Sequence, residues 1–213
     1  MCELSNAQKP VLKELFSWIQ VIAAAVIFAL FINNVIIINA SVPSGSMENT
    51  ITTGSRLLGF RLSYTFADPK RGDIVVFKYP VAKAMTREER KENDVQETYV
   101  KRIIGLPGET IVIRDSKIYI DESDTPLSEN YLPEKWNIKN TDQVYHVPEN
   151  CYFLLGDNRN NSADSRYWTE EAFDYGVADS IEEAEQFRYV PRGDIEGKVS
   201  FCYWPLTRAG SLY

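Results

Sequence analysis

The sequence has little histidine and cysteine: both residues bind zinc, and histidine supplies the base of the commonest catalytic triads. It contains one histidine, His146, and three cysteines among 213 residues. There is no Cys-x-x-Cys pair and no His/Cys cluster, so His146 could supply at most one metal ligand. We therefore predict no metal and no cofactor.

An excess of positive charge is also lacking. The formal net charge is −7, and no basic patch with interleaved aromatic residues is visible. Nucleic-acid binding is not expected, because it depends on neutralising phosphates with Lys and Arg. Charged residues make up 25% and hydrophobic residues 44%, which is typical of a folded globular protein and argues against disorder.

Only one long uncharged run is present, at residues 15–38. As a helix it would extend about 36 Å, more than the hydrocarbon core of a bilayer. A cleavable secretory signal is the alternative, but its apolar region has only about 7–15 residues. A cut after Ala40 would also place the bulky Ile38 where a small residue is needed. We predict a retained membrane anchor.

The basic residues near this run suggest its orientation. Lys9 and Lys13 precede the run closely, whereas the first basic residue after it is Arg56. The positive-inside bias then places the N-terminus in the cytoplasm and the rest of the chain outside. We therefore predict a single-pass protein of the cell membrane, with the lipid bilayer as a partner. Cys151 and Cys202 would both lie outside, where we favour two buried free thiols over a disulfide.

Beyond the run, short β-branched and aromatic segments alternate with Gly, Pro and Asp. This pattern predicts a mainly β fold, an all-β domain after the transmembrane helix. A hairpin is expected to turn at Asp115-Ser116. The expected strands lie within 56–60, 73–79, 99–105, 109–115, 117–121, 151–157 and 198–205. Residues 122–150 are polar and are expected to form loops and weak strands of a side subdomain.

Two highly charged segments interrupt the strands, at 83–97 and 169–187. Thr86 with Glu89, and Ser180 with Glu183, have the spacing of a helix capping box. We expect both segments to be solvated surface insertions, with a partner-binding element as the alternative.

Directly after the apolar run, "PSGSM" raises the question of whether Ser46 is a nucleophile. A serine hydroxyl needs a neighbouring base, and His146 lacks the usual context of a triad histidine. A lysine can act as the base if burial in an apolar site lowers its pKa. Lys101 in "YVKRIIG" fits this best and Lys78 in "VVFKYP" is its rival, although an edge-strand charge is the simpler reading of Lys101.

Taken together, four segments in order resemble the bacterial type I signal peptidases, which are membrane-anchored serine–lysine endopeptidases. These segments are "PSGSM", "RGDIVVFKYP" (71–80), "YVKRIIGLPGE" (99–109) and "GDNRNNSADSR" (156–166), and "GKVSFCYWP" (197–205) resembles the closing strand. The single anchor resembles the compact Gram-positive-like members. The resemblance implies removal of N-terminal signal peptides from exported preproteins, after small residues at −1 and −3, close to the secretion translocon.

The same resemblance implies a role for each matching residue. Ser46 would be the nucleophile and Lys101 the general base, with the Ser44 hydroxyl and the Ser46 N–H as the oxyanion hole. Ser162 would orient the lysine, while Asp164 and Arg166 would form an ion pair that braces the loop at 156–166. The remaining residues would support that loop or line the shallow substrate pockets: Asp157 and Arg159 for the loop, and Val42, Ile51, Tyr99 and Val100 for the pockets.

The expected organisation is a cytoplasmic tail (1–14), an anchor (15–38), a catalytic β domain (39–107 and 148–213) and an inserted subdomain (108–147). Asn160 departs from the family pattern, which often has Asp there, and 169–187 is longer than expected. Three alternatives remain open: a peptidase dedicated to few precursors, a non-catalytic membrane-anchored binding protein, and a self-cleaving repressor. The anchor argues against the last of these.

Overall fold

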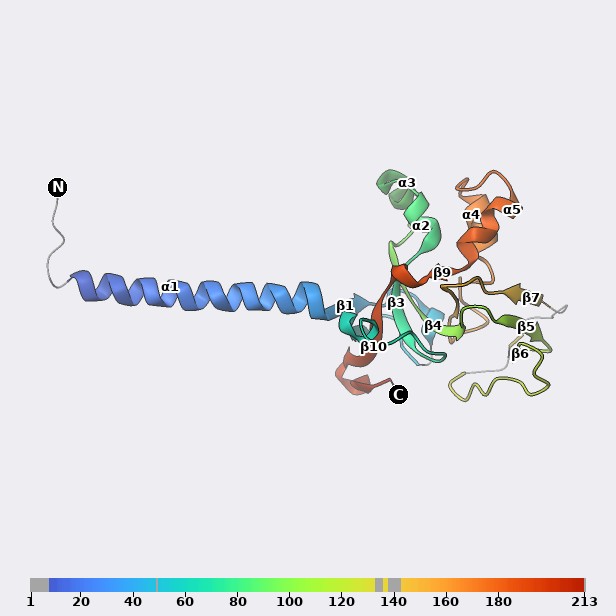
Figure 1. Ribbon diagram of the computed structural model, residues 1–213, viewed down its shortest axis with the longest axis horizontal. Helices are drawn as coiled ribbons and strands as arrows, with labels where there is room; N and C mark the ends of the chain where they lie inside the picture. The colour runs from blue at the N-terminus through green and yellow to red at the C-terminus, as the bar shows by residue number, and fades with distance from the viewer. Residues whose placement is uncertain (1–7, 49, 133–135, 138–142, 213) are drawn as a thin grey trace. The chain divides into compact units, whose positions relative to one another are not determined.

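The computed structural model describes residues 8–48, 50–132, 136–137 and 143–212. The chain divides into two compact units, Met1–Ile37 and Ile38–Tyr213, each of which is described by itself. The first unit is helical, and the second contains the strands (Figure 1).

Helix α1 (Gln8–Phe31) continues into a π-helical stretch (Ile32–Ile36). Residues Lys13–Ile36 are long and apolar enough to cross a membrane. Large apolar side chains such as Phe16, Trp18 and Ile27 are more than half exposed, as expected of a helix whose apolar surface faces lipid.

The predicted apolar run is helical only as far as Ile36. Ile37 and Ile38 belong instead to strand β1 (Ile37–Ser41), and the side chain of Ile38 is buried in an apolar cluster with Leu57 and Val199. β-branched side chains favour an extended backbone, and the domain provides the apolar surface that buries Ile38.

The mainly β fold predicted from the sequence is confirmed. The larger sheet has the strand order β1-β2-β10-β3-β4-β8-β9, and β11 pairs with β10. Strands β2, β3, β4, β8 and β10 overlap segments predicted from the sequence, whereas β1, β9 and β11 were not predicted. The bounds are β2 Arg56–Phe60, β3 Ile74–Lys78, β4 Thr98–Gly105, β8 Cys151–Leu155, β9 Val190–Pro191, β10 Ile195–Trp204 and β11 Gly210–Ser211.

A second, three-stranded sheet falls within residues 108–147, with the order β6-β5-β7. Its strands are β5 (Thr110–Arg114), β6 (Lys117–Ile120) and β7 (Gln143–His146). The predicted hairpin joins β5 to β6: Asp115 and Ser116 both have positive φ, which a two-residue turn of this hand requires. Isoleucines of β5 and β6 pack on Phe153 and Leu155 of β8, so this sheet shares a core with the larger one.

Short helices connect the strands: α2 Pro80–Ala84, α3 Arg87–Glu92, α4 Trp168–Asp174 and α5 Ile181–Ala184, and the 3-10 segments Arg61–Tyr64, Glu185–Arg188, Arg192–Asp194 and Leu206–Arg208. The capping box of Thr86 and Glu89 is confirmed, with both reciprocal hydrogen bonds present. Ser180 accepts from the backbone N of Glu183 as predicted, but the Glu183 carboxylate accepts from Asp179 instead.

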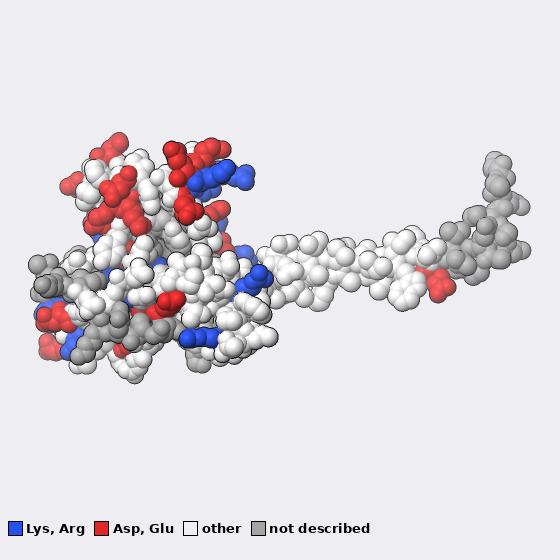
Figure 2. All heavy atoms as spheres, turned by 180° about the vertical axis from the view of Figure 1, so that it is seen from behind, with Lys and Arg blue, Asp and Glu red and all other residues white. Residues whose placement is uncertain are grey.

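Segment 169–187 is mostly exposed, as predicted of a solvated insertion, but one side of it is buried. Ala172, Ala178 and Ala184 are buried in the main apolar cluster beside the fully buried Trp168. Small alanine side chains let the segment lie close to the core, while its acidic residues stay at the surface. Figure 2 shows these Asp and Glu side chains gathered over the helical part of the domain. Helix α3, in the other charged segment, buries none of its residues.

Candidate active site

The turn that carries Ser46 is a single 3-10 turn, Gly45–Met47, a few residues beyond β1. Met47 is fully buried and anchors the turn in the apolar cluster of β2, β3 and β10. Asn158 holds the turn from the opposite side: its backbone N donates to the Ser46 carbonyl at 3.0 Å, and its side-chain Nδ2 donates to the Gly45 carbonyl at 3.0 Å. The position of Ser46 is therefore fixed by the buried Met47 side chain and by the two hydrogen bonds from Asn158.

Lys101 lies in the middle of β4, paired with Val75 of β3. Its side chain is 3% exposed, and its Nζ lies 2.6 Å from Ser46 Oγ. The structure thus brings together the two residues predicted as nucleophile and base, 55 positions apart in the sequence. That distance is within the reach needed for proton transfer.

The surroundings of Lys101 favour its neutral form. The pKa of the Lys101 ammonium is lowered to about 8: burial is the largest cause and Arg166 acts in the same direction, while Asp164, Glu171 and Asp157 oppose the change. Burial prevails because the free energy lost on removing the ammonium from water exceeds the free energy gained from its attraction to these carboxylates. A sizeable fraction of neutral amine is then present near pH 8.

Ser44 lies on the exposed side of the same turn. Its hydroxyl donates to Ser46 Oγ at 3.3 Å, so both serine hydroxyls face one space. The predicted oxyanion-hole donor is therefore next to the predicted nucleophile.

Asp164 and Arg166 form the ion pair that the sequence predicted. Arg166 Nε and Nη2 donate to the two carboxylate oxygens, each at 2.8 Å, and the backbone N of Gly156 donates to the same carboxylate at 3.1 Å. Burial alone would raise the pKa of the Asp164 carboxyl, but Arg166 and Lys101 hold it below its usual range. Asp164 is thus a buried carboxylate that remains charged.

Asp157 and Arg159 lie in the same loop, but each pairs with a residue outside it. Asp157 receives two hydrogen bonds from Arg102, at 2.8 and 2.7 Å, and a third from Thr50 Oγ1 at 2.5 Å. Arg159 pairs with Glu129 at 2.6 Å. The loop is therefore joined to β4, to the segment after Ser46 and to residues preceding β7.

Ser162, predicted to orient Lys101, is buried, and its Oγ has no hydrogen-bond partner among the residues that the structure describes. The hydroxyl packs against Gly156. A Cβ at position 156 would overlap both Ser162 Oγ and the Ser46 carbonyl oxygen. Gly156 is needed here for space, since its backbone is not in the left-handed region.

The four residues predicted to line substrate pockets belong to two faces. Val42 and Ile51 are buried in one apolar cluster, against which Val100 packs. Tyr99 packs with another cluster, and its ring lies 4.7 Å from that of Tyr79. This division follows from β4, because consecutive side chains of a strand point to opposite faces.

Sequence reasoning missed Asn158, Arg102 and Thr50, which hold the loop and the nucleophile turn together. Arg102 follows Lys101 in a buried strand, and a buried arginine predicts a carboxylate partner; nothing local indicated which one. The other two candidates for the base of Ser46 are both exposed. Lys78 lies at the end of β3, and His146 lies in β7 beside Thr110 Oγ1. Asn160, the departure noted above, accepts a hydrogen bond from Asn137 N at 2.7 Å.

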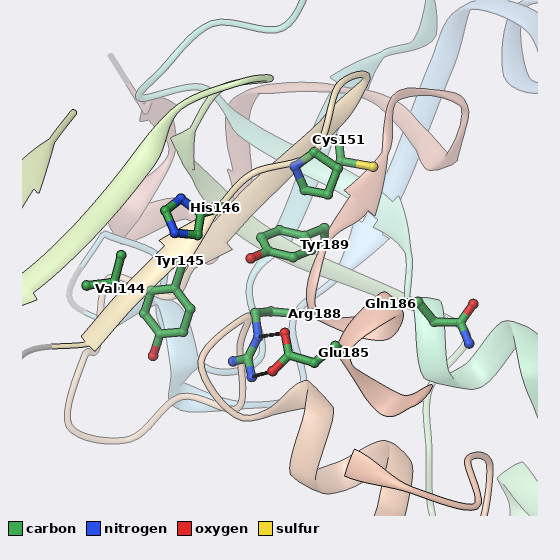
Figure 3. A pocket seen from close by; sticks show the side chains of 9 residues that line it. Val144, Tyr145, His146, Cys151, Glu185, Gln186, Arg188 and Tyr189 are labelled. Atoms are coloured by element: carbon green, nitrogen blue, oxygen red, sulfur yellow. Dashed lines mark hydrogen bonds and ion pairs between the residues drawn. The ribbon is translucent and has the colours of Figure 1, made fainter. Parts of the chain in front are cut away.

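A cavity of about 520 Å³ lies between β7, the start of β8 and the 3-10 segment Glu185–Arg188. Figure 3 shows the Arg188–Glu185 ion pair beside the Tyr145 ring. None of the predicted site residues lines this cavity. Cys151 does line it, and in the described part of the chain both Cys151 and Cys202 are free thiols, as favoured above.

Comparison with known proteins identifies the family. The sequence pattern of the family described as "Signal peptidase, peptidase S26" matches residues 15–204. The chain is 34% identical to a signal peptidase I of Leptolyngbya laminosa, over 93% of this chain and 84% of the other. It is 36% identical to a signal peptidase I of Bacillus licheniformis, over 71% of this chain and 78% of the other.

A crystal structure of a signal peptidase I from Enterococcus faecalis V583 is also similar, with a TM-score of 0.41 and 31% identity, over 62% of this chain and 97% of the other. The family pattern spans both Ser46 and Lys101 and most of the chain. The chain belongs to the signal peptidases of peptidase family S26, and is a serine endopeptidase of the signal peptidase I kind.

Proposed function

We propose that the protein removes signal peptides from exported preproteins with Ser46 as the nucleophile and Lys101 as the general base. The observation that carries this proposal is the 2.6 Å contact between Lys101 Nζ and Ser46 Oγ in a buried site. While charged, the ammonium donates in this contact; once neutral, the amine accepts the hydroxyl proton.

The reaction then proceeds in two stages. Ser46 Oγ attacks the scissile carbonyl as its proton passes to Lys101, and the resulting oxyanion is stabilised by the Ser46 N–H and the Ser44 hydroxyl. Lys101 returns the proton to the leaving amine, which departs with the mature protein. Water, deprotonated by the neutral amine, then attacks the acyl-enzyme; the bond to Ser46 Oγ breaks, Lys101 returns the proton to Oγ, and the signal peptide is released. An oxyanion donor typically contributes about 2.7–4 kcal/mol of transition-state stabilisation.

The surrounding residues have the roles expected from the sequence. Asp164, Arg166, Asp157 and Arg159 fix the loop behind the lysine, and Ser162 orients the amine when a substrate is bound. Val42, Ile51, Tyr99 and Val100 restrict the residues at −1 and −3 to small ones, because larger side chains have no room.

The proposed location is the outer face of the cell membrane, with α1 as a single membrane-spanning anchor and the N-terminus in the cytoplasm. The proposed domain organisation keeps the inserted subdomain at 108–147, while the anchor ends at Ile36 because β1 begins at Ile37. Substrates would be met as they leave the secretion translocon. Labelling of single introduced cysteines from outside intact cells, in a background without Cys2, Cys151 and Cys202, tests this topology. Labelling at position 70 but not at position 6 is expected.

The test of the function is cleavage of a purified preprotein by the full chain in detergent. Wild type is expected to release the signal peptide, whereas Ser46→Ala and Lys101→Ala are expected to be inactive although both still fold, as a cooperative thermal unfolding transition would show. Lys78→Ala is the matched control, because Lys78 lies on the neighbouring strand and is exposed. Cleavage by either dyad variant would contradict the assignment. Wild type that cuts one precursor but not general preproteins would indicate a dedicated peptidase.

A further inference from the structure

A series of arginine–aromatic contacts joins the loop at 156–166, which lies behind the Ser46–Lys101 pair, to the inserted region at 108–147. Four arginine guanidinium groups of the catalytic part each lie near the ring of an aromatic residue from 131–145. The pairs are Arg102 with Tyr131 at 4.0 Å, Arg159 with Trp136 at 4.9 Å, Arg166 with Trp136 at 5.4 Å and Arg188 with Tyr145 at 5.1 Å.

Every one of these arginines also contacts the loop 156–166. Arg102 pairs with Asp157, and Arg166 pairs with Asp164. Arg159 Nε donates to the Gly156 carbonyl at 2.9 Å, and Arg188 Nη1 donates to the Ser165 and Arg166 carbonyls. Figure 3 shows Arg188 close to the Tyr145 ring. The aromatic residues thus cover the outer side of the groups that fix the loop.

Tyr131 has the shortest of these contacts and is held in place itself. Its hydroxyl donates to Glu129 at 2.8 Å, and the same carboxylate binds Arg159 at 2.6 Å. The ring of Tyr131 therefore lies between two arginines with its polar end satisfied. Such stacking suits a guanidinium, because the planar cation can contact a ring while its edge forms hydrogen bonds.

A continuous path of contacts leads from Tyr131 to the nucleophile. Its ring contacts Arg102, whose Nε and Nη2 hold both oxygens of Asp157. The next residue, Asn158, donates to the carbonyls of Gly45 and Ser46. A displacement of Arg102 would therefore be transmitted to the Ser46 turn through its hydrogen bonds to Asp157, the backbone between Asp157 and Asn158, and the hydrogen bonds of Asn158.

We propose that Tyr131 is a positioning residue for peptide cleavage: its ring keeps the Arg102 guanidinium seated on Asp157, and this contact holds Asn158 against the Ser46 turn. The inference rests on the proposed function of the Ser46–Lys101 pair. It assigns the inserted region a part in catalysis, although none of its residues touches Ser46 or Lys101 in the described structure.

Steady-state cleavage by the full chain in detergent tests the proposal with three variants. Tyr131→Ala is expected to lower kcat by about 10²-fold with little change in KM, since small misplacements of a nucleophile have effects of this size. Tyr131→Phe keeps the ring and is expected to retain activity near wild type. Tyr119→Ala removes the ring beside the exposed Arg114, at 4.7 Å in the same inserted region, and is the matched control with unchanged kcat.

A second readout is independent of cleavage. NMR titration of the ¹³C-lysine-labelled full chain, assigned with Lys101→Ala, reports the charge of Lys101 directly. The charged groups acting on it are Asp157, Asp164, Glu171 and Arg166, and Arg102 neutralises Asp157. Loss of Arg102 from Asp157 leaves that carboxylate uncompensated, so Tyr131→Ala should move the titration to higher pH while Tyr131→Phe leaves it in place.

The outcomes separate the inference from the function on which it rests. Normal kcat and an unchanged lysine titration in folded Tyr131→Ala would overturn the positioning role, whatever wild type cleaves. A loss of kcat in Tyr131→Phe equal to that in Tyr131→Ala would also overturn the role of the ring. If wild type fails to cleave any preprotein but the titration still moves only in Tyr131→Ala, the proposed function fails and the positioning of the site stands.

Discussion

Lys101 and Arg102 are neighbours in β4, point to opposite faces and are both buried, yet their partners differ in kind. Arg102 is seated on the Asp157 carboxylate by two hydrogen bonds. Lys101 instead contacts the Ser46 hydroxyl at 2.6 Å, and the carboxylates that act on it act from farther away. One buried cation is neutralised by a partner, whereas the other is left to lose its proton.

The difference shows how one strand can carry both a structural and a reactive cation. A guanidinium keeps its charge in a protein, so burial requires a counter-ion. An ammonium can escape the cost of burial by becoming neutral, provided that no carboxylate contacts it directly. Changing the cation, or the carboxylate beside it, should therefore decide whether the buried group stays charged or loses its proton.

The largest effect is expected from Lys101→Arg, which makes the two cations alike. The guanidinium cannot deprotonate near neutral pH, so the general base is lost. We expect kcat to fall by roughly 10²–10⁴-fold or more, measured by preprotein cleavage. Substantial cleavage by this variant at pH 8 would mean that Lys101 acts only through its charge.

The second prediction removes the partner of Arg102. Asp157→Asn leaves a buried guanidinium without its counter-ion, and breaking such a pair costs about 3–5 kcal/mol of unfolding free energy. Chemical denaturation of the folded domain measures this change. Asp68→Asn is the control, because Asp68 is 90% exposed and lies 3.5 Å from Arg192. Equal stability of the two variants would contradict the expectation that the buried Asp157–Arg102 pair contributes more to stability than the exposed Asp68–Arg192 pair.

The third prediction concerns how much the buried ammonium of Lys101 lowers the free energy of unfolding. Its pKa is about 8 when folded and about 10.4 in an unfolded chain. Between these values the unfolded state binds more protons at Lys101, so the contribution of this residue to the unfolding free energy rises with pH. Lys101→Met should therefore be more stable than wild type by about 1–3 kcal/mol below pH 8, and this gain should vanish above about pH 10.4. A gain independent of pH would have another cause.

The smallest effect is expected from Glu171→Gln. Tyr79 donates its hydroxyl to Glu171 at 2.5 Å, and the carboxylate raises the pKa of Lys101. Wild-type kcat/KM should rise with pH and level off above about 8, because the neutral amine is the active form. In Glu171→Gln this rise should occur at lower pH, by up to about one pH unit. Glu170→Gln, on the exposed side of α4, should leave the profile unchanged.

Much of the site could be predicted because its reactive residues lie in distinctive local sequences. Ser46 lies in a Pro/Gly turn, and Lys101 interrupts an apolar strand. The strand segments followed from the same β-branched and aromatic pattern. Composition alone still favoured an edge-strand charge for Lys101, and its role as the base came from the resemblance of four ordered segments to a known family.

The contacts that support the site could not be predicted in the same way. Asp157 and Arg159 are close in sequence but pair with Arg102 and Glu129, because the sheet order decides which charges meet. Acidic composition likewise suggested a solvated segment at 169–187, whereas a few alanines were enough to bury one side of it. Partner choice and burial depend on the packed structure, not on the composition of a segment.

Gly156 gives the site an unusual mutational property. The residue has no demanding backbone angle, so nothing in its conformation distinguishes it from a tolerant loop position. The space beside it, however, is already filled by the Ser46 carbonyl oxygen and the Ser162 hydroxyl. In a library of all substitutions, position 156 should accept glycine alone, and even one added methyl group should separate the nucleophile from the loop that holds its base.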